Sequence, residues 1–256
     1  MRLVLKHTLV FALPSPARAV EHLLLTPIAT AQQKIEQWSI EMPGLEGAAN
    51  FRDGFGNRAH LVSQVKPGET LTITVTGIVE TTDKAGVLGR IEYDAPPALY
   101  RRVTESTEPD PELLAGIDAA GGRIALLHDL MSRVHQRPAA TQSQSQSDEG
   151  QAQSQTQRAP AELAHAFIGV ARALDIPARY VTGYVCDGET PPAVHAWAEA
   201  WDDGLGWIGF DPLFNVCPTD GHIRLAAGLD ATGTMPVRMI PAPADAPLQT
   251  LEIDIA

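Results

Sequence analysis

The sequence is poor in cysteine, in basic residues and in long apolar runs. Its 256 residues include two cysteines, Cys186 and Cys217, which is too few for a disulfide framework and favours a reduced, cytoplasmic protein. No run approaches the roughly 20 apolar residues of a membrane-spanning helix, so no membrane partner is expected. Lys and Arg number 19 against 31 Asp and Glu, for a formal net charge of −12. Because a phosphate backbone needs a clustered basic surface, this charge argues against a nucleic-acid partner.

We do not interpret the N-terminus as a secretory signal, although Ala17-Arg18-Ala19 resembles a cleavage site. The apolar region before it is interrupted by Lys6 and His7, and its residues alternate in a pattern of period two. Such alternation is typical of a β-strand rather than of a continuous apolar signal segment. We therefore predict a strand here and no signal peptide.

The first hundred residues predict a β-rich region. Glu69–Glu80 (ETLTITVTGIVE) gives the clearest strand, with apolar residues on one face and threonines on the other. Further strands are expected at Leu23–Thr26, Lys34–Glu41 and Asn50–Lys66, the last with a turn in FRDGFGNR. Strands at such short spacing favour a sandwich or open barrel. We assign residues 1–105 to an N-terminal β domain, because Pro-rich stretches near 95–97 and 108–111 mark a linker.

Residues 106–256 predict a second domain that mixes helices and strands. Apolar residues at helical spacing indicate helices at Arg123–Gln136 and Pro160–Leu174. Strands are expected at Ala178–Cys186, Ala193–Trp201, Trp207–Asp211, His222–Leu229 and Leu248–Ile253. The Gln/Ser tract Thr141–Gln157 cannot bury a core, so we predict a mobile loop there.

One His and one Asp stand at the ends of neighbouring predicted strands. His195 begins HAWAEAW, and Asp211 ends the strand in GLGWIGFDP. A hairpin can bring this imidazole and carboxylate together, which is the base and orienter half of a nucleophilic triad. When only the spacing is considered, a His and an Asp placed like this are more often separate surface or core residues than a catalytic pair. The start of the second predicted helix, RAPAELAHAF, has neither thiol nor hydroxyl between Arg158 and Ala164.

Four segments, LDIPARYVTGY, HAWAEAW, GLGWIGFDP and HIRLAAGLDA, occur in this order from residue 174 to residue 231. Together they resemble the bacterial transglutaminase-like family of the papain-type cysteine-peptidase superfamily, and FRDGFGN resembles an element of the β domain that precedes its core. The resemblance covers nearly the whole chain. It implies an α+β fold, in which an N-terminal β-sandwich-like domain precedes a transglutaminase-like core of helices packed on an antiparallel sheet.

The same resemblance implies a nucleophilic Cys at the start of the helix before IPARY, in a segment like GVCQDxAHxF. Ala164-His165 and Phe167 match its end, which places the Cys position at Pro160 and the acid position at Glu162. His195 then matches the general base and Asp211 the residue that orients it. A helix N-terminus activates a thiol, and the nucleophile's backbone N–H commonly serves as an oxyanion donor. Proline supplies neither group.

We therefore predict a pseudoenzyme: a transglutaminase-like protein without thiol catalysis that keeps a cleft for a peptide or protein ligand. It would serve as a binding or regulatory module. Two alternatives stay open. One is a working amide hydrolase or acyltransferase that uses Cys217 or another untypical nucleophile, although a free Cys is more often a small buried hydrophobe; the other is a purely structural partner in a larger assembly. Whether the protein is an enzyme is therefore left uncertain.

Neither a cofactor nor a metal is predicted. A metal site could recruit His165, His195, Glu199 and Asp211, but no HxxxH or CxxC spacing supports it. His165 is expected on a helix that faces the core or the cleft wall, and Glu199 is equally suited to pair with an Arg.

Overall fold

The computed structural model describes residues 1–13, 18–117, 121–137, 159–186, 188, 190–243 and 245–256. The predicted mobile loop at Thr141–Gln157 lies outside these residues. The described elements, in chain order, are β1 (Arg2–Ala12), β2 (Arg18–Thr26), β3 (Gln33–Glu41), η1 (Leu45–Gly47), β4 (Ala49–Arg52), β5 (Arg58–Val65), β6 (Thr70–Thr81), β7 (Val87–Gly89), η2 (Pro97–Arg101), η3 (Glu105–Thr107), α1 (Pro111–Leu114), α2 (Arg123–Gln136), α3 (Pro160–Ala173), β8 (Ala178–Val185), β9 (Ala193–Asp202), β10 (Gly206–Phe210), β11 (His222–Gly228), β12 (Val237–Ile240) and β13 (Leu248–Ile255).

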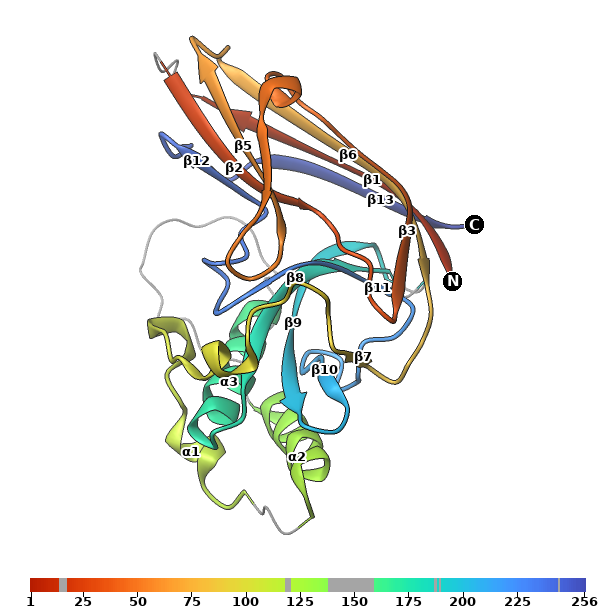
Figure 1. The fold of residues 1–256 in the computed structure, drawn as a ribbon, viewed down its shortest axis with the longest axis vertical. Helices are drawn as coiled ribbons and strands as arrows, with labels where there is room; N and C mark the ends of the chain where they lie inside the picture. Colours follow the sequence, from red (N-terminus) through yellow and green to blue (C-terminus); the bar gives the residue numbers. More distant parts are fainter. Residues whose placement is uncertain (14–17, 118–120, 138–158, 187, 189, 244) are drawn as a thin grey trace, which may run out of the picture.

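The N-terminal region forms two four-stranded antiparallel sheets, with strand orders β13-β1-β6-β3 and β12-β2-β5-β4. Alternate residues of β1 and β6 are buried, as their period-two patterns predict. Buried side chains from both sheets share one core, for example Leu5, Val62 and Ile73. The predicted sandwich-like region is therefore confirmed, and Figure 1 shows its two sheets above the helices.

Strands from the second half of the chain complete these sheets. β13 pairs with β1 along residues 248–255, and β12 pairs with β2. In the other direction, β7 pairs with β10 of the core sheet. The domain boundary between residues 105 and 106 stays a prediction. All three sheets contain strands from both sides of it. The two chain ends consequently lie side by side in Figure 1, where Ala256 N–H donates to the Arg2 carbonyl.

The core is a five-stranded antiparallel sheet of order β11-β8-β9-β10-β7. Helices α2 and α3 pack on one face, where Ala198 and Ala200 of β9 lie in the same cluster as Phe167 of α3. Small side chains on the strand allow the helix to approach closely. On the other side, Ile223 and Leu225 of β11 join the core of the N-terminal sheets. The α+β fold and the antiparallel sheet under the second helix are confirmed.

Two amide side chains from the N-terminal region bind the free edge of β11. Gln33 Nε2 donates to the Arg224 carbonyl, and Arg224 N–H donates to Gln33 Oε1, both at 2.8 Å. Asn57 makes the same pair with Ala227, at 2.7 and 2.9 Å. Each amide thus satisfies backbone groups that an edge strand would otherwise leave unpaired. The FRDGFGN turn is in this respect an anchor between the two regions.

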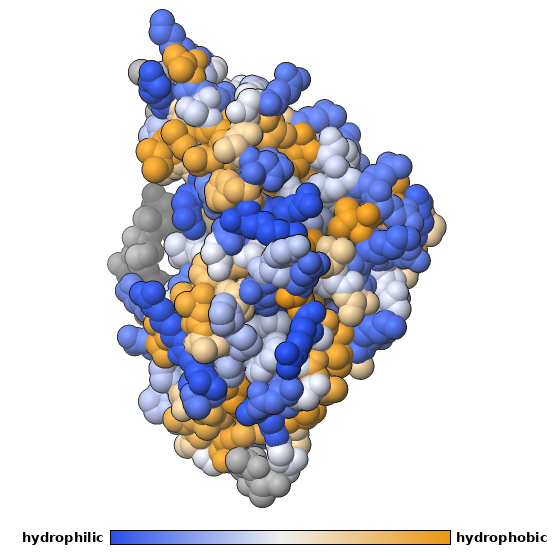
Figure 2. Space-filling model, viewed as in Figure 1, coloured by the Kyte–Doolittle hydropathy of each residue, from blue (hydrophilic) through white to orange (hydrophobic). Residues whose placement is uncertain are grey.

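Figure 2 shows apolar residues gathered over the upper sheet that contains β2, β5 and β12, above a face where polar and apolar residues alternate. Exposed apolar residues of that sheet include Val20, Leu61, Val65 and Ile240.

Among the helices that the structure describes, none is long and apolar enough to cross a membrane.

Candidate functional site

His195 and Asp211 meet at one end of the β9–β10 hairpin. Phe210 pairs with Ala198 in this hairpin, so Asp211 follows directly at the end of β10 that lies toward His195. The His195 Nε2 atom lies 2.5 Å from Asp211 Oδ2, and both residues are buried. The predicted contact is present. The catalytic roles of the two residues stay a prediction.

The Asp211 carboxylate accepts hydrogen bonds on both oxygens. Oδ1 accepts from the N–H groups of Leu213 and Phe214 at 2.9 and 3.4 Å, and Oδ2 accepts from His195 and His222. Burial raises the pKa of Asp211, but hydrogen bonds and charge from the two imidazoles more than offset it, so the pKa lies below its usual value. Asp211 is therefore ionised and acts only as an acceptor.

His222, at the start of β11, is a second partner of Asp211 that no motif assigned to the site. Its Nδ1 accepts the backbone N–H of Thr219 at 3.1 Å, so the proton of the neutral ring lies on Nε2. That nitrogen lies 3.2 Å from Asp211 Oδ2 and donates to it. The sequence signal was the HIRLAAGLDA segment, which carries the family resemblance but gives no role for its His.

His195 lines a cavity, and one of its ring nitrogens has no partner among the described residues. Because Asp211 can only accept, the His195 Nε2 atom carries a proton, and in the neutral ring Nδ1 keeps a lone pair. Among the described residues, none donates a hydrogen bond to Nδ1. Phe214 lies at the side of the ring, with centroids 5.3 Å apart. The ring is thus held so that Nδ1 is the nitrogen available to a ligand.

The cavity beside His195 has a volume of about 260 Å³. Its lining residues are Pro160, Ala161, Tyr180, Thr182, Val194, His195, Ala196, Ala231, Met235 and Pro236. Pro160 is the first residue of α3, as the sequence predicts. The Thr182 hydroxyl donates to Thr234 at 2.8 Å, and burial raises the pKa of Tyr180 to about 12. None of these lining residues offers an activated nucleophile.

Glu162, the acid position implied by the resemblance, lies elsewhere. It is in the first turn of α3 but lines a different cavity, together with His165 and Glu108. The His165 Nε2 atom accepts the Ala231 N–H at 3.0 Å, and the His165 ring packs on Tyr180. His165 therefore packs from α3 against Tyr180 and Ala231, two residues that line the His195 cavity, which agrees with its expected position at the core or cleft wall.

Both cysteines lie away from the lining of the His195 cavity. Cys217 packs beside Gly86, where a Cβ would come within 2.8 Å of the Cys217 Cβ. Burial, and then the charge of Asp83, raise the pKa of the Cys217 thiol. Cys186 is buried at the end of β8, with its Sγ 3.8 Å from the Ile253 carbonyl. A raised pKa disfavours the thiolate, which is the nucleophilic form.

His195, Asp211 and His222 also have the spacing of a metal site, since one ligand atom from each lies within 4.8 Å of the others. The hydrogen bonds do not fit a metal. Thr219 N–H occupies His222 Nδ1 and thereby keeps a proton on the nitrogen that would bind the ion. Glu199, which the sequence also offered, instead pairs with Arg179 and Arg224 at 2.6 and 2.8 Å.

The Transglutaminase-like superfamily profile matches residues 126–212, and the profile of the bacterial transglutaminase-like N-terminal region matches residues 3–80. The chain thus combines a transglutaminase-like core with a bacterial transglutaminase-like N-terminal region.

Three known proteins are similar to it. An uncharacterised protein of Mycobacterium leprae is 26% identical over 261 residues, which cover 94% of this chain and 92% of that protein. A protein-glutamine gamma-glutamyltransferase of Pseudomonas aeruginosa is 39% identical over 80 residues, only 27% of this chain and 11% of that enzyme. The crystal structure of a candidate cysteine protease from Cytophaga hutchinsonii has a TM-score of 0.72 and 21% identity, covering 99% of this chain and 90% of that one. This last similarity shows a common fold.

Proposed function

We propose that the protein is a binding or regulatory module of the transglutaminase-like superfamily that does not perform thiol catalysis. The observation that carries this proposal is Pro160, which begins α3 and lines the cavity into which His195 faces. By the family resemblance this is the position of the nucleophilic Cys. A residue without a side-chain nucleophile at that place leaves His195 with no thiol to deprotonate.

Pro160 removes a second group besides the thiol. Its nitrogen has no hydrogen, so it cannot donate to an oxyanion, and loss of one such donor typically lowers a rate by about 10²–10³-fold. As a first helical residue, however, proline stabilises the start of α3, because the N–H it lacks has no partner inside the helix. The helix is therefore kept while the covalent step is lost.

The ligand that suits this cavity is a peptide segment of a protein. The His195 Nδ1 atom offers an acceptor, which a backbone or side-chain amide N–H can meet. Around it, Val194, Ala231 and Met235 supply apolar walls for a side chain. A reduced, cytoplasmic setting is part of the same proposal and agrees with the two free thiols.

Alkylation and turnover assays test the proposal. The wild-type protein should show no amide hydrolysis or acyl transfer above background on peptide and glutamine substrates. Cys186 and Cys217 should react slowly with iodoacetamide at neutral pH, because both are sheltered and the pKa of Cys217 is raised. Turnover that disappears in Cys217→Ala, together with fast labelling of Cys217, would overturn the proposal in favour of an active enzyme.

Restoring the thiol with Pro160→Cys tests the geometry of the site. If His195 and Asp211 remain in position, this variant should gain iodoacetamide-sensitive hydrolysis, and Pro160→Cys combined with His195→Ala should not. Pro160→Ala is the matched control, because it restores the N–H but not the thiol. Activity in Pro160→Ala would show that a group other than the residue-160 thiol is the nucleophile.

A further inference from the structure

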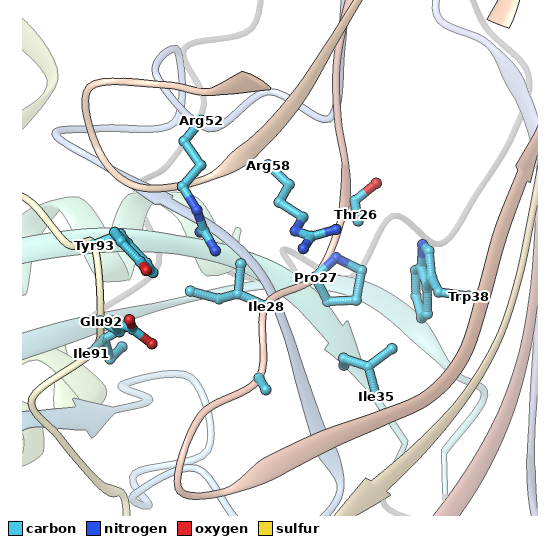
Figure 3. A pocket seen from close by; sticks show the side chains of 11 residues that line it. Thr26, Pro27, Ile28, Ile35, Trp38, Arg52, Arg58, Ile91, Glu92 and Tyr93 are labelled. Carbon is cyan, nitrogen blue, oxygen red and sulfur yellow. The ribbon is translucent and has the colours of Figure 1, made fainter. Parts of the chain in front are cut away.

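A separate cavity of about 400 Å³ opens between the N-terminal sheets and the segment that follows β7. Figure 3 shows its side chains. They are Thr26, Pro27, Ile28, Ala29, Ile35, Trp38, Arg52, Arg58, Ile91, Glu92 and Tyr93. It shares no residue with the lining of the His195 cavity. Its ligand would therefore be independent of the proposed function.

Two arginines enter this cavity from opposite strands of one hairpin. Arg52 ends β4 and Arg58 begins β5, and the two pair directly across the FRDGFGN turn. In Figure 3 both guanidinium groups point into the same space. Like charges opposite each other on neighbouring strands destabilise a sheet. Among the described residues, no carboxylate forms an ion pair with either, although the chain has a formal net charge of −12.

The Arg52 side chain is held in place before any ligand arrives. Its Nη1 donates to the Gly56 carbonyl at 3.0 Å, and its guanidinium carbon lies 4.8 Å from the centre of the Tyr93 ring. Most of its N–H donors remain free, since the guanidinium group has five. A fork of this kind binds the two oxygens of a carboxylate or phosphate side by side.

The rest of the cavity wall is largely apolar and includes a flat surface. The Trp38 ring is fixed because its Nε1 donates to the Leu25 carbonyl at 2.8 Å. In Figure 3, Pro27 lies between Arg58 and Trp38, Ile28 lies below the two arginines, and Ile35 lies below Trp38. In Figure 3, Glu92 and Tyr93 lie on the side of Arg52, opposite Trp38. Through a hydrogen bond and its charge, Glu92 raises the pKa of Tyr93. Because the Glu92 carboxylate repels an anion, a bound anion is expected between the Arg52 and Arg58 guanidinium groups rather than beside Glu92.

We propose that this cavity binds a small organic oxyanion, a carboxylate or phosphate group carried on a flat apolar body. The oxyanion lies between Arg52 and Arg58, and the apolar body packs against Ile28 and Trp38. The bound anion neutralises the cross-strand pair of positive charges, which gives the arginines the partner that the chain itself does not supply.

Calorimetric titration with phenyl phosphate and benzoate tests this proposal. Either probe should bind, and the neutral analogue benzyl alcohol and inorganic phosphate should each bind more weakly. Arg52→Gln and Arg58→Gln should each weaken binding about tenfold or more, since hydrogen bonds to charged groups are the strong ones. Glu92→Gln should tighten binding by removing a repelling charge, and added salt should weaken it.

Arg102→Gln is the matched control, because Arg102 is exposed, lies outside the cavity and carries the same charge. It should leave the affinity within about twofold of wild type. Binding of phenyl phosphate alone, or of benzoate alone, supports the proposal and identifies the oxyanion. Absence of binding by both probes overturns it, as does equal binding by wild type and the variant lacking both arginines, with circular dichroism showing that each variant is folded.

Discussion

Two buried carboxylates, Glu21 and Asp211, show how the same group can stabilise or destabilise this fold. Both side chains are fully buried. Asp211 accepts from two imidazoles and two backbone N–H groups. Glu21 accepts from Gln64 at 3.2 Å through Oε1, and its Oε2 has no partner in the described part of the chain. The first carboxylate is satisfied as an anion, whereas the second is left with an unsolvated oxygen.

The pKa shifts of these two groups have opposite signs. Burial raises the pKa of Glu21, and the hydrogen bond from Gln64 offsets this only in part. The folded state then holds this proton more tightly than the unfolded state. Its contribution to stability is complete below the unfolded pKa and is lost as the pH rises through the folded pKa. For Asp211 the folded pKa is lowered, so its contribution is present above the unfolded pKa and is lost as the pH falls.

Glu21→Gln should therefore stabilise the protein at neutral pH, by about 1 kcal/mol, because it removes a buried charge and can keep an acceptor for Gln64. The gain should shrink as the pH approaches the unfolded pKa of a glutamate, ~4.3. Urea unfolding at neutral and at acid pH measures both values. Asp211→Asn should have the opposite effect and lower the free energy of unfolding by about 3 kcal/mol at neutral pH. A loss of stability in Glu21→Gln at neutral pH would show that its charge is solvated.

At the scale of helices and strands, local patterns predicted most of the elements. The helix at Arg123–Gln136 has the predicted bounds, and α3 begins at Pro160 as expected. Strands β3, β6 and β8–β10 lie within one or two residues of their predicted ranges. β1, β6 and α2 are recognisable because each buries one face, which imposes a period of 2 or 3.6 on its residues. Every residue of β8 and β10 is buried, so these strands lack that alternation.

Long-range pairing was not predictable in the same way. Nothing local in Leu248–Ile255 indicates that it pairs with β1, and the short edge strand β12 carries too few residues to show a period. The sequence indicated an Arg partner for Glu199 without identifying Arg179 and Arg224, which come from two other strands. The contact between His222 and Asp211 was not predictable either. It depends on β11 lying beside β8 in the sheet, and not on the number of residues between His222 and Asp211.

The FRDGFGN turn gives a prediction at this scale. Asn57→Ala should lower the free energy of unfolding by about 2–3 kcal/mol, because it removes two hydrogen bonds to Ala227 and leaves that backbone N–H and carbonyl unpaired in the interior. Chemical denaturation followed by circular dichroism gives the value. Asn50→Ala in the neighbouring strand is the control, since Asn50 makes an exposed contact with His60 and should change stability by less than about 0.5 kcal/mol. Equal effects for the two variants would show that the turn does not anchor the regions.

Strand pairs between the first and second halves of the chain hold the whole molecule together. β13 runs beside β1, β12 beside β2, and β7 extends the sheet that carries His195. The apolar core of the N-terminal sheets includes Ile223 and Leu225 from β11. Through Gln33 and Asn57, the same strand is bound along its free edge. Separation of the two regions would thus expose apolar surface and break strand pairs in both of them.

Unfolding should accordingly be a single cooperative event that includes both regions. Hydrogen exchange measured by mass spectrometry should give β6, in an N-terminal sheet, and β8, in the core sheet, the same opening free energy, because neither can open while the other keeps its partners. Asn57→Ala should lower both values by the same amount, although Asn57 contacts only one strand of the core. Asn50→Ala should lower neither. If β6 opened at a lower free energy than β8, and Asn57→Ala shifted β6 alone, the N-terminal region would be an independent domain, and the predicted boundary between residues 105 and 106 would separate two units of stability.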